Sequence, residues 1–151
     1  MLAGAFERRE EATRRACEPL VEWTKGDGED PIEGPLTRAV EGYLGFLLDS
    51  PAFLRLVLRE ELAGASVLRE VPRSSRAIED AIGAVRGLAG TRGIGAFDTT
   101  DVVLLFVSLT FFPASQGSTL MATLGLDLDD DATRDRHVRF VVDQLVAQVR
   151  D

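Results

Sequence analysis

The chain has 151 residues, a formal net charge of −8 and 45% hydrophobic residues, which are proportions of one globular domain and not of a disordered segment. The negative charge argues against a chain that grips nucleic acid by itself, because DNA affinity depends on clustered Lys and Arg side chains. A lone cysteine, Cys17, cannot form an internal disulfide, no apolar signal segment opens the sequence, and the longest apolar run is too short to span a membrane. We therefore expect a soluble, cytoplasmic protein with no membrane partner.

The first part of the chain favours helices separated by proline and glycine signals. Residues 2–20 have an amphipathic pattern, and Pro19 is expected to kink or end this helix. The segment 25–31, rich in Gly and Asp, is predicted to be a loop. A second helix is predicted over 35–48, with Pro35 in its first turn.

Ser50 and Pro51 are typical of an N-cap and the first helical position, so a third helix should begin there and extend to about residue 62. A fourth helix is predicted from residue 74 or 75 to about residue 88. The glycine-rich segment 87–95 should be a mobile connection.

The second half of the chain continues the helical pattern. Asp98 is predicted to cap a helix that carries the apolar run to Phe112, and Pro113 should stop or bend it. A shorter helical turn over 118–124 and an acidic loop precede a last helix that extends to about Val149. We find no convincing strand and no internal repeat, so the predicted class is all-α.

Several stretches resemble the sensor domains of TetR-family transcriptional regulators. The run from Gly42 to Leu62 is similar to the family's arrangement of a helix, a Ser-Pro junction and a helix that ends in an acidic pair. The runs 108–115 and 137–145 resemble the family's dimerisation helices, and residues 2–11 look like the helix that leaves its DNA-binding head.

The resemblance implies a multi-helix, TetR-like C-terminal domain over residues 1–151 that binds an effector and dimerises through a four-helix bundle of its last two long helices. The helix-turn-helix head of the family would have to precede Met1, and this sequence does not contain it. DNA would be contacted only through that head. The sequence does not distinguish a trimmed chain from a naturally headless product.

The helix over 102–112 is apolar on all sides, which requires cover on both sides. A second subunit is the cover that we favour, and the valine-rich last helix raises the same need. The alternative is a central core helix wrapped by the other helices. The predicted dimer-interface residues are Val103, Val107, Phe111, Val138, Val141, Val142, Leu145 and Val149.

Aromatic side chains occur on several of the predicted helices and could line an apolar cavity. They could equally form an ordinary core, and the resemblance favours a pocket for a small, mostly apolar effector. The predicted ligand-binding residues are Trp23, Tyr43, Phe46, Leu47, Val57, Glu61, Phe106, Phe112 and Met121.

The sequence offers little support for catalysis. His137 is the only histidine, no nucleophile is tied to it by spacing, and one Cys with one His cannot make a structural zinc site. The acids at 127–131 resemble the start of a calcium loop, but Ala132 and Val138 replace its glycine and its bidentate Glu. We expect no catalytic residue, metal or cofactor, and a small helical enzyme is the least favoured hypothesis.

The sequence therefore predicts the small-molecule-sensing and dimerisation domain of a TetR-like regulator, expected to be a repressor. The alternative is a headless helical interaction module that pairs with itself or with a full-length relative without sensing a ligand.

Overall fold

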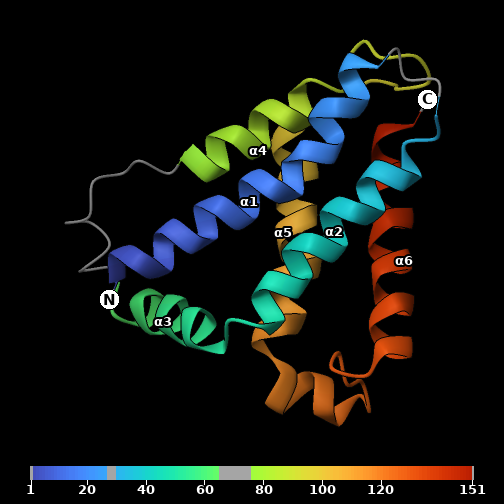
Figure 1. The fold of residues 1–151 in the computed structure, drawn as a ribbon. Helices are drawn as coiled ribbons and strands as arrows, with labels where there is room; N and C mark the ends of the chain where they lie inside the picture. Colours follow the sequence, from blue (N-terminus) through green and yellow to red (C-terminus); the bar gives the residue numbers. More distant parts are fainter. Residues whose placement is uncertain (1, 27–29, 65–75, 151) are drawn as a thin grey trace.

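The computed structural model describes residues 2–26, 30–64 and 76–150, and helices dominate these ranges (Figure 1). The elements in chain order are α1 (Leu2–Lys25), α2 (Glu33–Leu48), α3 (Pro51–Leu62), α4 (Arg76–Arg86), α5 (Thr99–Ser115), the π-helical turn η1 (Gly117–Met121) and α6 (Asp131–Val149). The β-type pairing in these ranges is an isolated bridge between Ile94 and Arg150. The all-α prediction is confirmed.

Helix α1 continues through Pro19, so of the two predicted effects of this proline, a kink or an end of the helix, the end does not occur. A proline inside a helix removes one backbone hydrogen bond, here to the carbonyl of Arg15. The side chain of Arg15 is exposed, so this turn lies on the solvent side of the helix. Beyond the proline, the buried side chains of Leu20 and Trp23 anchor the last turns of α1. Packing of those turns outweighs the local cost.

The predicted N-cap Asp98 has the expected chemistry, and Asp130 caps α6 in the same way. The Asp98 carboxylate accepts a hydrogen bond of 3.0 Å from the backbone N–H of Asp101, and the Asp130 carboxylate accepts one of 2.9 Å from the N–H of Thr133. Ser50 stands at the N-cap of α3 as predicted, but its side chain makes no capping bond. The start of α3 is therefore set by the proline at its first turn rather than by a hydroxyl cap.

Other predicted boundaries shift by a few residues. Helix α2 begins at Glu33, so Pro35 stays in its first turn, and α5 continues through Pro113 to Ser115. Helix α4 begins at Arg76, and the predicted start at residue 74 or 75 lies outside the described residues.

The helices are arranged in space so that α2 is central (Figure 1). Helix α1 packs against α2 and α4, while α2 also packs against α5 and α6. Near the C-terminal end, Arg150 forms an ion pair with Glu33 at the start of α2. His137 of α6 lies 2.8 Å from the backbone carbonyl of Leu109, which joins α5 to α6. Helices from distant parts of the sequence thus enclose one interior.

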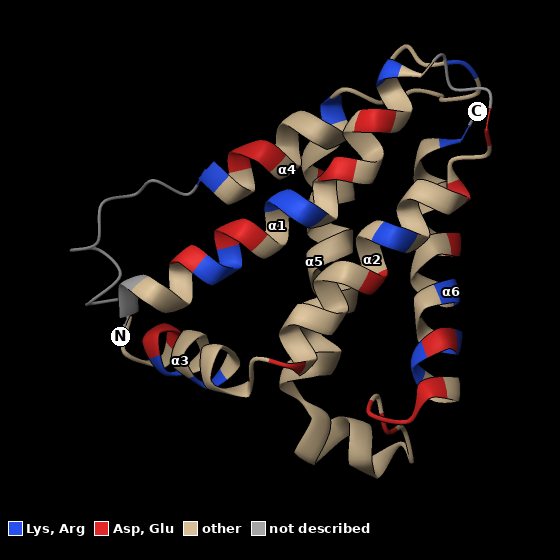
Figure 2. Ribbon diagram, viewed as in Figure 1, with Lys and Arg blue, Asp and Glu red and all other residues tan. Residues whose placement is uncertain are grey.

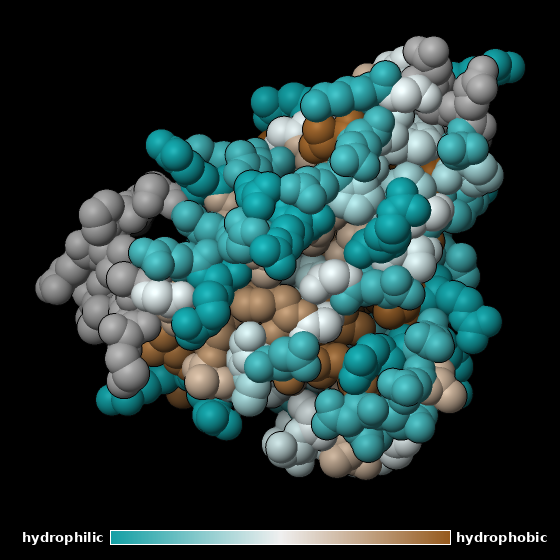
Figure 3. All heavy atoms as spheres, viewed as in Figure 1, coloured by the Kyte–Doolittle hydropathy of each residue, from teal (hydrophilic) through white to brown (hydrophobic). Residues whose placement is uncertain are grey.

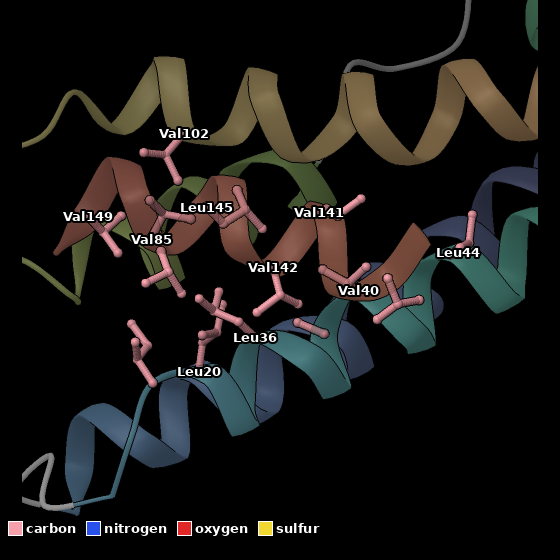
Figure 4. Close-up of a cluster of buried hydrophobic side chains, with 14 of the residues drawn as sticks. Leu20, Leu36, Val40, Leu44, Val85, Val102, Val141, Val142, Leu145 and Val149 are labelled. Atoms are coloured by element: carbon pink, nitrogen blue, oxygen red, sulfur yellow. The ribbon is translucent and has the colours of Figure 1, made fainter. Parts of the chain in front are cut away.

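The main core lies where α6 faces α2 (Figure 4). Leu36, Val40 and Leu44 of α2 have exposed fractions of 5% or less. They share a cluster with the valine-rich face of α6, and Val85 and Val102 join it from α4 and α5. Removal of these side chains from water stabilises the fold, at roughly 0.8 kcal/mol for each buried CH₂.

The connection over 87–95 is tied to the rest of the fold, whereas we predicted a mobile segment. The side chain of Leu88 is only 1% exposed, and the N–H of Gly95 donates a 2.8 Å hydrogen bond to the carbonyl of Val149. Gly90 and Gly93 both adopt φ of +82°, a left-handed conformation that favours glycine. These two glycines therefore permit tight turns in the connection. None of the described helices has the length and apolar character needed to cross a membrane.

Candidate ligand-binding cavity

A cavity of about 290 Å³, partly open to solvent, lies among the helices. All six α-helices contribute to its wall, and this size is near the lower end of roughly 300–1,000 Å³ that is typical of small-molecule sites. Its lining residues are Arg9, Thr13, Ala16, Cys17, Leu20, Leu36, Ala39, Tyr43, Phe53, Val57, Ala77, Ile78, Ala81, Val85, Leu88, Val102, Val103, Phe106, Val107, Phe111, Leu145 and Val149. Seen from outside, the face over α1 and α3 shows hydrophobic residues between charged ones (Figure 3).

The wall is almost entirely hydrocarbon, with its few polar groups on one side. Thr13, Cys17 and Arg9 come from α1, and Tyr43 comes from α2. Arg9 is the charged member of this wall, and no Asp or Glu is found among its described residues. Such a cavity favours an apolar molecule, oriented by a small number of polar contacts.

The polar side of the cavity is built on successive turns of α1. The hydroxyl of Thr13 donates a 2.8 Å hydrogen bond to the backbone carbonyl of Arg9, one turn earlier. The guanidinium carbon of Arg9 lies 5.0 Å from the ring centroid of Phe6, in a cation–π contact. The Nε atom of Arg9 is buried and has no hydrogen-bond partner.

Tyr43 stands at the same end of the cavity. Burial raises the pKa of its phenol, and the positive charge of Arg9 opposes part of that rise. The hydroxyl of Tyr43 therefore stays protonated at neutral pH and is a donor. Its ring packs against Phe106, with ring centroids 5.5 Å apart, so α2 and α5 meet at this part of the wall.

The Cys17 thiol belongs to the cavity wall but not to a reactive site. Burial, with a further contribution from the charge of Asp80, raises the pKa of Cys17 to about 11. A thiol of this kind is protonated at neutral pH and is a poor nucleophile. It contributes a small, weakly polar surface to the cavity.

Three of the predicted ligand-binding residues line this cavity: Tyr43, Val57 and Phe106. Their role in binding stays a prediction. Leu47 does not reach the cavity, because it is fully buried in a second cluster with Phe53 and Leu54.

The remaining predicted ligand residues lie elsewhere. Trp23 is buried in the main core, where its indole N–H donates a 2.8 Å hydrogen bond to the carbonyl of Asp30. Phe46 lines a groove between α1 and α2, on the outer side of the helices. Met121 is buried beneath α6, and the side chain of Phe112 is 51% exposed. The aromatic or sulfur-containing character of a side chain therefore does not show by itself whether the residue lies in the core or lines the cavity.

Glu61, the predicted polar contact, is exposed, and its neighbour Glu60 is buried instead. The exposed position of Glu61 agrees with the alternative to the pocket contact, an exposed acid, and the inward-facing acid of α3 is Glu60. Neither residue is among those that line the cavity.

The predicted dimer-interface residues of α6 lie inside the protomer. Val138, Val141, Val142, Leu145 and Val149 are at most 4% exposed and belong to the main core (Figure 4). The apolar stripe of α6 correctly identified a buried face, but α2 of the same chain covers it. These side chains are thus not available to a second subunit in this arrangement.

The predicted interface residues of α5 face the cavity. Val103, Val107 and Phe111 all line it, although Val107 is also 38% exposed. Leu104, one turn before Val107 and on the same side of α5, is 61% exposed. Val102 and Phe106 also line the cavity, so more than one side of α5 faces it, and an interface role for Val103, Val107 and Phe111 stays a prediction. A helix that is apolar all round gives no periodic signal that separates a cavity face from an interface face.

An exposed apolar surface remains on the last part of the chain. Its members are large hydrophobic side chains that are at least 42% exposed: Leu104, Phe112, Leu120, Leu124 and Phe140. We call these residues the outer apolar face. Helix α5, which carries two of them, is almost free of charged residues along its length (Figure 2). An apolar surface of this kind is typical of a protein contact.

We predicted a ligand contact from α1 at Trp23, whereas the residues of α1 that line the cavity are Arg9, Thr13, Ala16, Cys17 and Leu20. Arg9, Thr13, Cys17 and Leu20 follow helical spacing and share one face, but the polar members of this face carry no apolar signal. The alanines of the wall, such as Ala39, were missed because small side chains carry little hydrophobic signal. A count of all positions on the α1 face, and not only of the apolar ones, would have found it.

Comparison with protein families finds a match over residues 31–145 to the model described as "Tetracyclin repressor-like, C-terminal domain". Comparisons with curated proteins and with solved structures find no match. The family match covers more than half of the chain, and the all-α arrangement agrees with it. The chain belongs to the tetracycline repressor-like C-terminal domain family.

Proposed function

We propose that this chain is the effector-binding and dimerisation domain of a TetR-like transcriptional regulator, a repressor that acts in the cytoplasm. The observation that carries the proposal is the apolar cavity of about 290 Å³, lined by side chains of all six α-helices. Residues from both ends of the chain form its wall, so a molecule bound there would contact most of the fold at once. The family match supports the same role.

The cavity includes the helix that would transmit a signal. Five residues of α1 line it: Arg9, Thr13, Ala16, Cys17 and Leu20. In the family resemblance, α1 is the helix that leaves the DNA-binding head. A ligand that binds one position of α1 more tightly than another shifts the population between the two positions. We propose that effector binding reaches DNA in this way, through a head that precedes α1 in the regulator.

The binding part of this proposal is tested with N-phenyl-1-naphthylamine, a neutral apolar dye whose emission rises when it leaves water. Saturable binding at one site per chain is the expected result. The matched variant is Ala39→Leu, which places a larger side chain in the cavity wall and should abolish the signal. Non-saturable binding, or equal binding by the Ala39→Leu variant, would contradict a ligand cavity at this place.

The outer apolar face supports homodimerisation as the second part of the proposal. Leu104 and Phe112 lie on α5 and Phe140 lies on α6, so a two-fold axis beside these helices would join four helices in one bundle. This surface replaces the valine face of α6 as the proposed interface. It supports equally the alternative of a module that pairs with a full-length relative. Sedimentation across a concentration series tests it, and a strictly monomeric chain at micromolar concentration would overturn it.

A further inference from the structure

Among the described residues of the cavity wall, one side chain is charged, the cation Arg9, and none is an acid. We propose that the effector is an amphiphile with an apolar body and a single carboxylate, and that the carboxylate accepts hydrogen bonds from the Arg9 guanidinium and the Tyr43 hydroxyl. This inference rests on the proposed function and names the class of molecule that the cavity takes.

The environment of the Arg9 guanidinium favours an anionic partner. Its Nε atom is buried without a hydrogen-bond partner, and its guanidinium carbon lies 5.0 Å from the centroid of the Phe6 ring. A ring face attracts the cation, but it offers no acceptor that would satisfy the buried Nε–H group. A polar group that is buried without a hydrogen-bond partner is unfavourable. A ligand oxygen beside Arg9 would accept the hydrogen bond for which the protein offers no acceptor.

The polar groups beside Arg9 suit a carboxylate better than a cation. The Tyr43 hydroxyl is a neutral donor, because burial raises the pKa of the phenol. The Thr13 hydroxyl already donates to the backbone carbonyl of Arg9. Since the described part of the wall has no carboxylate, an ammonium group would be repelled by the charge of Arg9 with no nearby anion to offset the repulsion.

The rest of the wall suits an apolar body. Ala77, Val85 and Val103 come from α4 and α5, and Leu145 and Val149 come from α6. These side chains offer only hydrocarbon. The head group of the effector therefore belongs at α1 and α2, and its apolar part belongs among α4, α5 and α6.

The test compares three probes of equal chain length: octanoate, 1-octanol and octylamine. Their dissociation constants are measured from displacement of N-phenyl-1-naphthylamine, for the wild type and for Arg9→Met. The control variant is Arg8→Met, which removes the same charge from the exposed neighbouring position on α1. Arg9→Lys keeps the charge with a different geometry, and the thermal unfolding transition shows that each variant is folded.

We expect octanoate to bind the wild type at least ten-fold more tightly than it binds Arg9→Met. The affinity for 1-octanol should change less than three-fold, and octylamine should bind least. Arg8→Met should behave as the wild type, and Arg9→Lys should keep the preference for octanoate over octylamine. A free energy of 1.4 kcal/mol corresponds to the ten-fold change.

The outcomes separate the two proposals. If 1-octanol and the dye bind but the affinity for octanoate does not depend on Arg9, the carboxylate inference is overturned and the ligand cavity stands. An equal loss in Arg8→Met and Arg9→Met would also overturn it, because the effect would come from net charge. If no probe binds, the proposed function fails first.

Discussion

We predict that the substitution Ala39→Leu raises the stability of the fold, because Ala39 lies beside the cavity. The same substitution in a packed core would lower the stability. Ala39 is 2% exposed and lines the cavity, so the three added carbon atoms enter existing space. At roughly 0.8 kcal/mol for each buried CH₂ the transfer contributes up to about 2.4 kcal/mol. The rotamer freedom that leucine loses offsets about 0.5–1 kcal/mol of this. We expect the free energy of unfolding to rise by about 1.5 kcal/mol.

The matched control is Ala5→Leu, because Ala5 is buried at 8% exposure but is not among the cavity residues. Insertion of the same atoms into a packed site costs about 1–3 kcal/mol. The assay is urea denaturation at one fixed protein concentration, followed by the fluorescence of Trp23, the only tryptophan. Equal destabilisation by both substitutions would refute the claim that usable space exists beside Ala39.

Four further predictions concern other parts of the structure. Phe140→Glu should raise the dimer dissociation constant at least ten-fold in sedimentation, because it places a charge on the outer apolar face. The control Leu62→Glu, at an exposed apolar position on α3, should leave the dissociation constant unchanged, and equal effects would contradict this interface. Since the pKa of Cys17 is raised from 9.0 to about 11, its thiolate fraction at pH 8 should be about 100-fold below that of a free thiol, and alkylation by iodoacetamide should slow accordingly; a rate equal to that of the unfolded chain would contradict it. Between pH 9 and 11 the Cys17 thiol stays protonated in the folded state but loses its proton in the unfolded chain. The Cys17 contribution to stability is therefore complete below pH 9 and is lost as the pH rises towards 11. Cys17→Ala should reduce the fall of the unfolding free energy over this pH interval. Trp23→Phe removes the 2.8 Å hydrogen bond to the Asp30 carbonyl and should lower the free energy of unfolding by about 1 kcal/mol in urea titrations followed by circular dichroism, and an unchanged value would show that water replaces the bond.

The helices could be predicted from sequence because their apolar periodicity and their end signals agree. Pro51 begins α3, the Asp98 carboxylate caps α5, and the stripe of α6 is buried as its spacing required. Pro19 shows where local rules fail. Its cost to the helix is local, but the compensating burial of Trp23 depends on helices that are distant in the sequence.

The site could be predicted only in part, because periodicity shows that a face is buried and not what covers it. Val141 is covered by α2 of its own chain, and Val103 faces a cavity, yet both have the spacing of an interface residue. Arg9 was missed for the opposite reason. A charged residue is expected in solvent, and only the packing of α1 against α2 and α4 brings this one to a cavity wall.

The central claim is that a small apolar molecule binds inside this cavity, and methyl NMR of protein labelled at Ile, Leu and Val tests it most directly. On titration with 1-octanol, the account predicts shifts of the methyl resonances of Val57 and Val103, which line the cavity, while those of Val138 and Val141 stay in place. Absence of any shift, or shifts confined to the exposed Leu124 and its surroundings, would contradict the account.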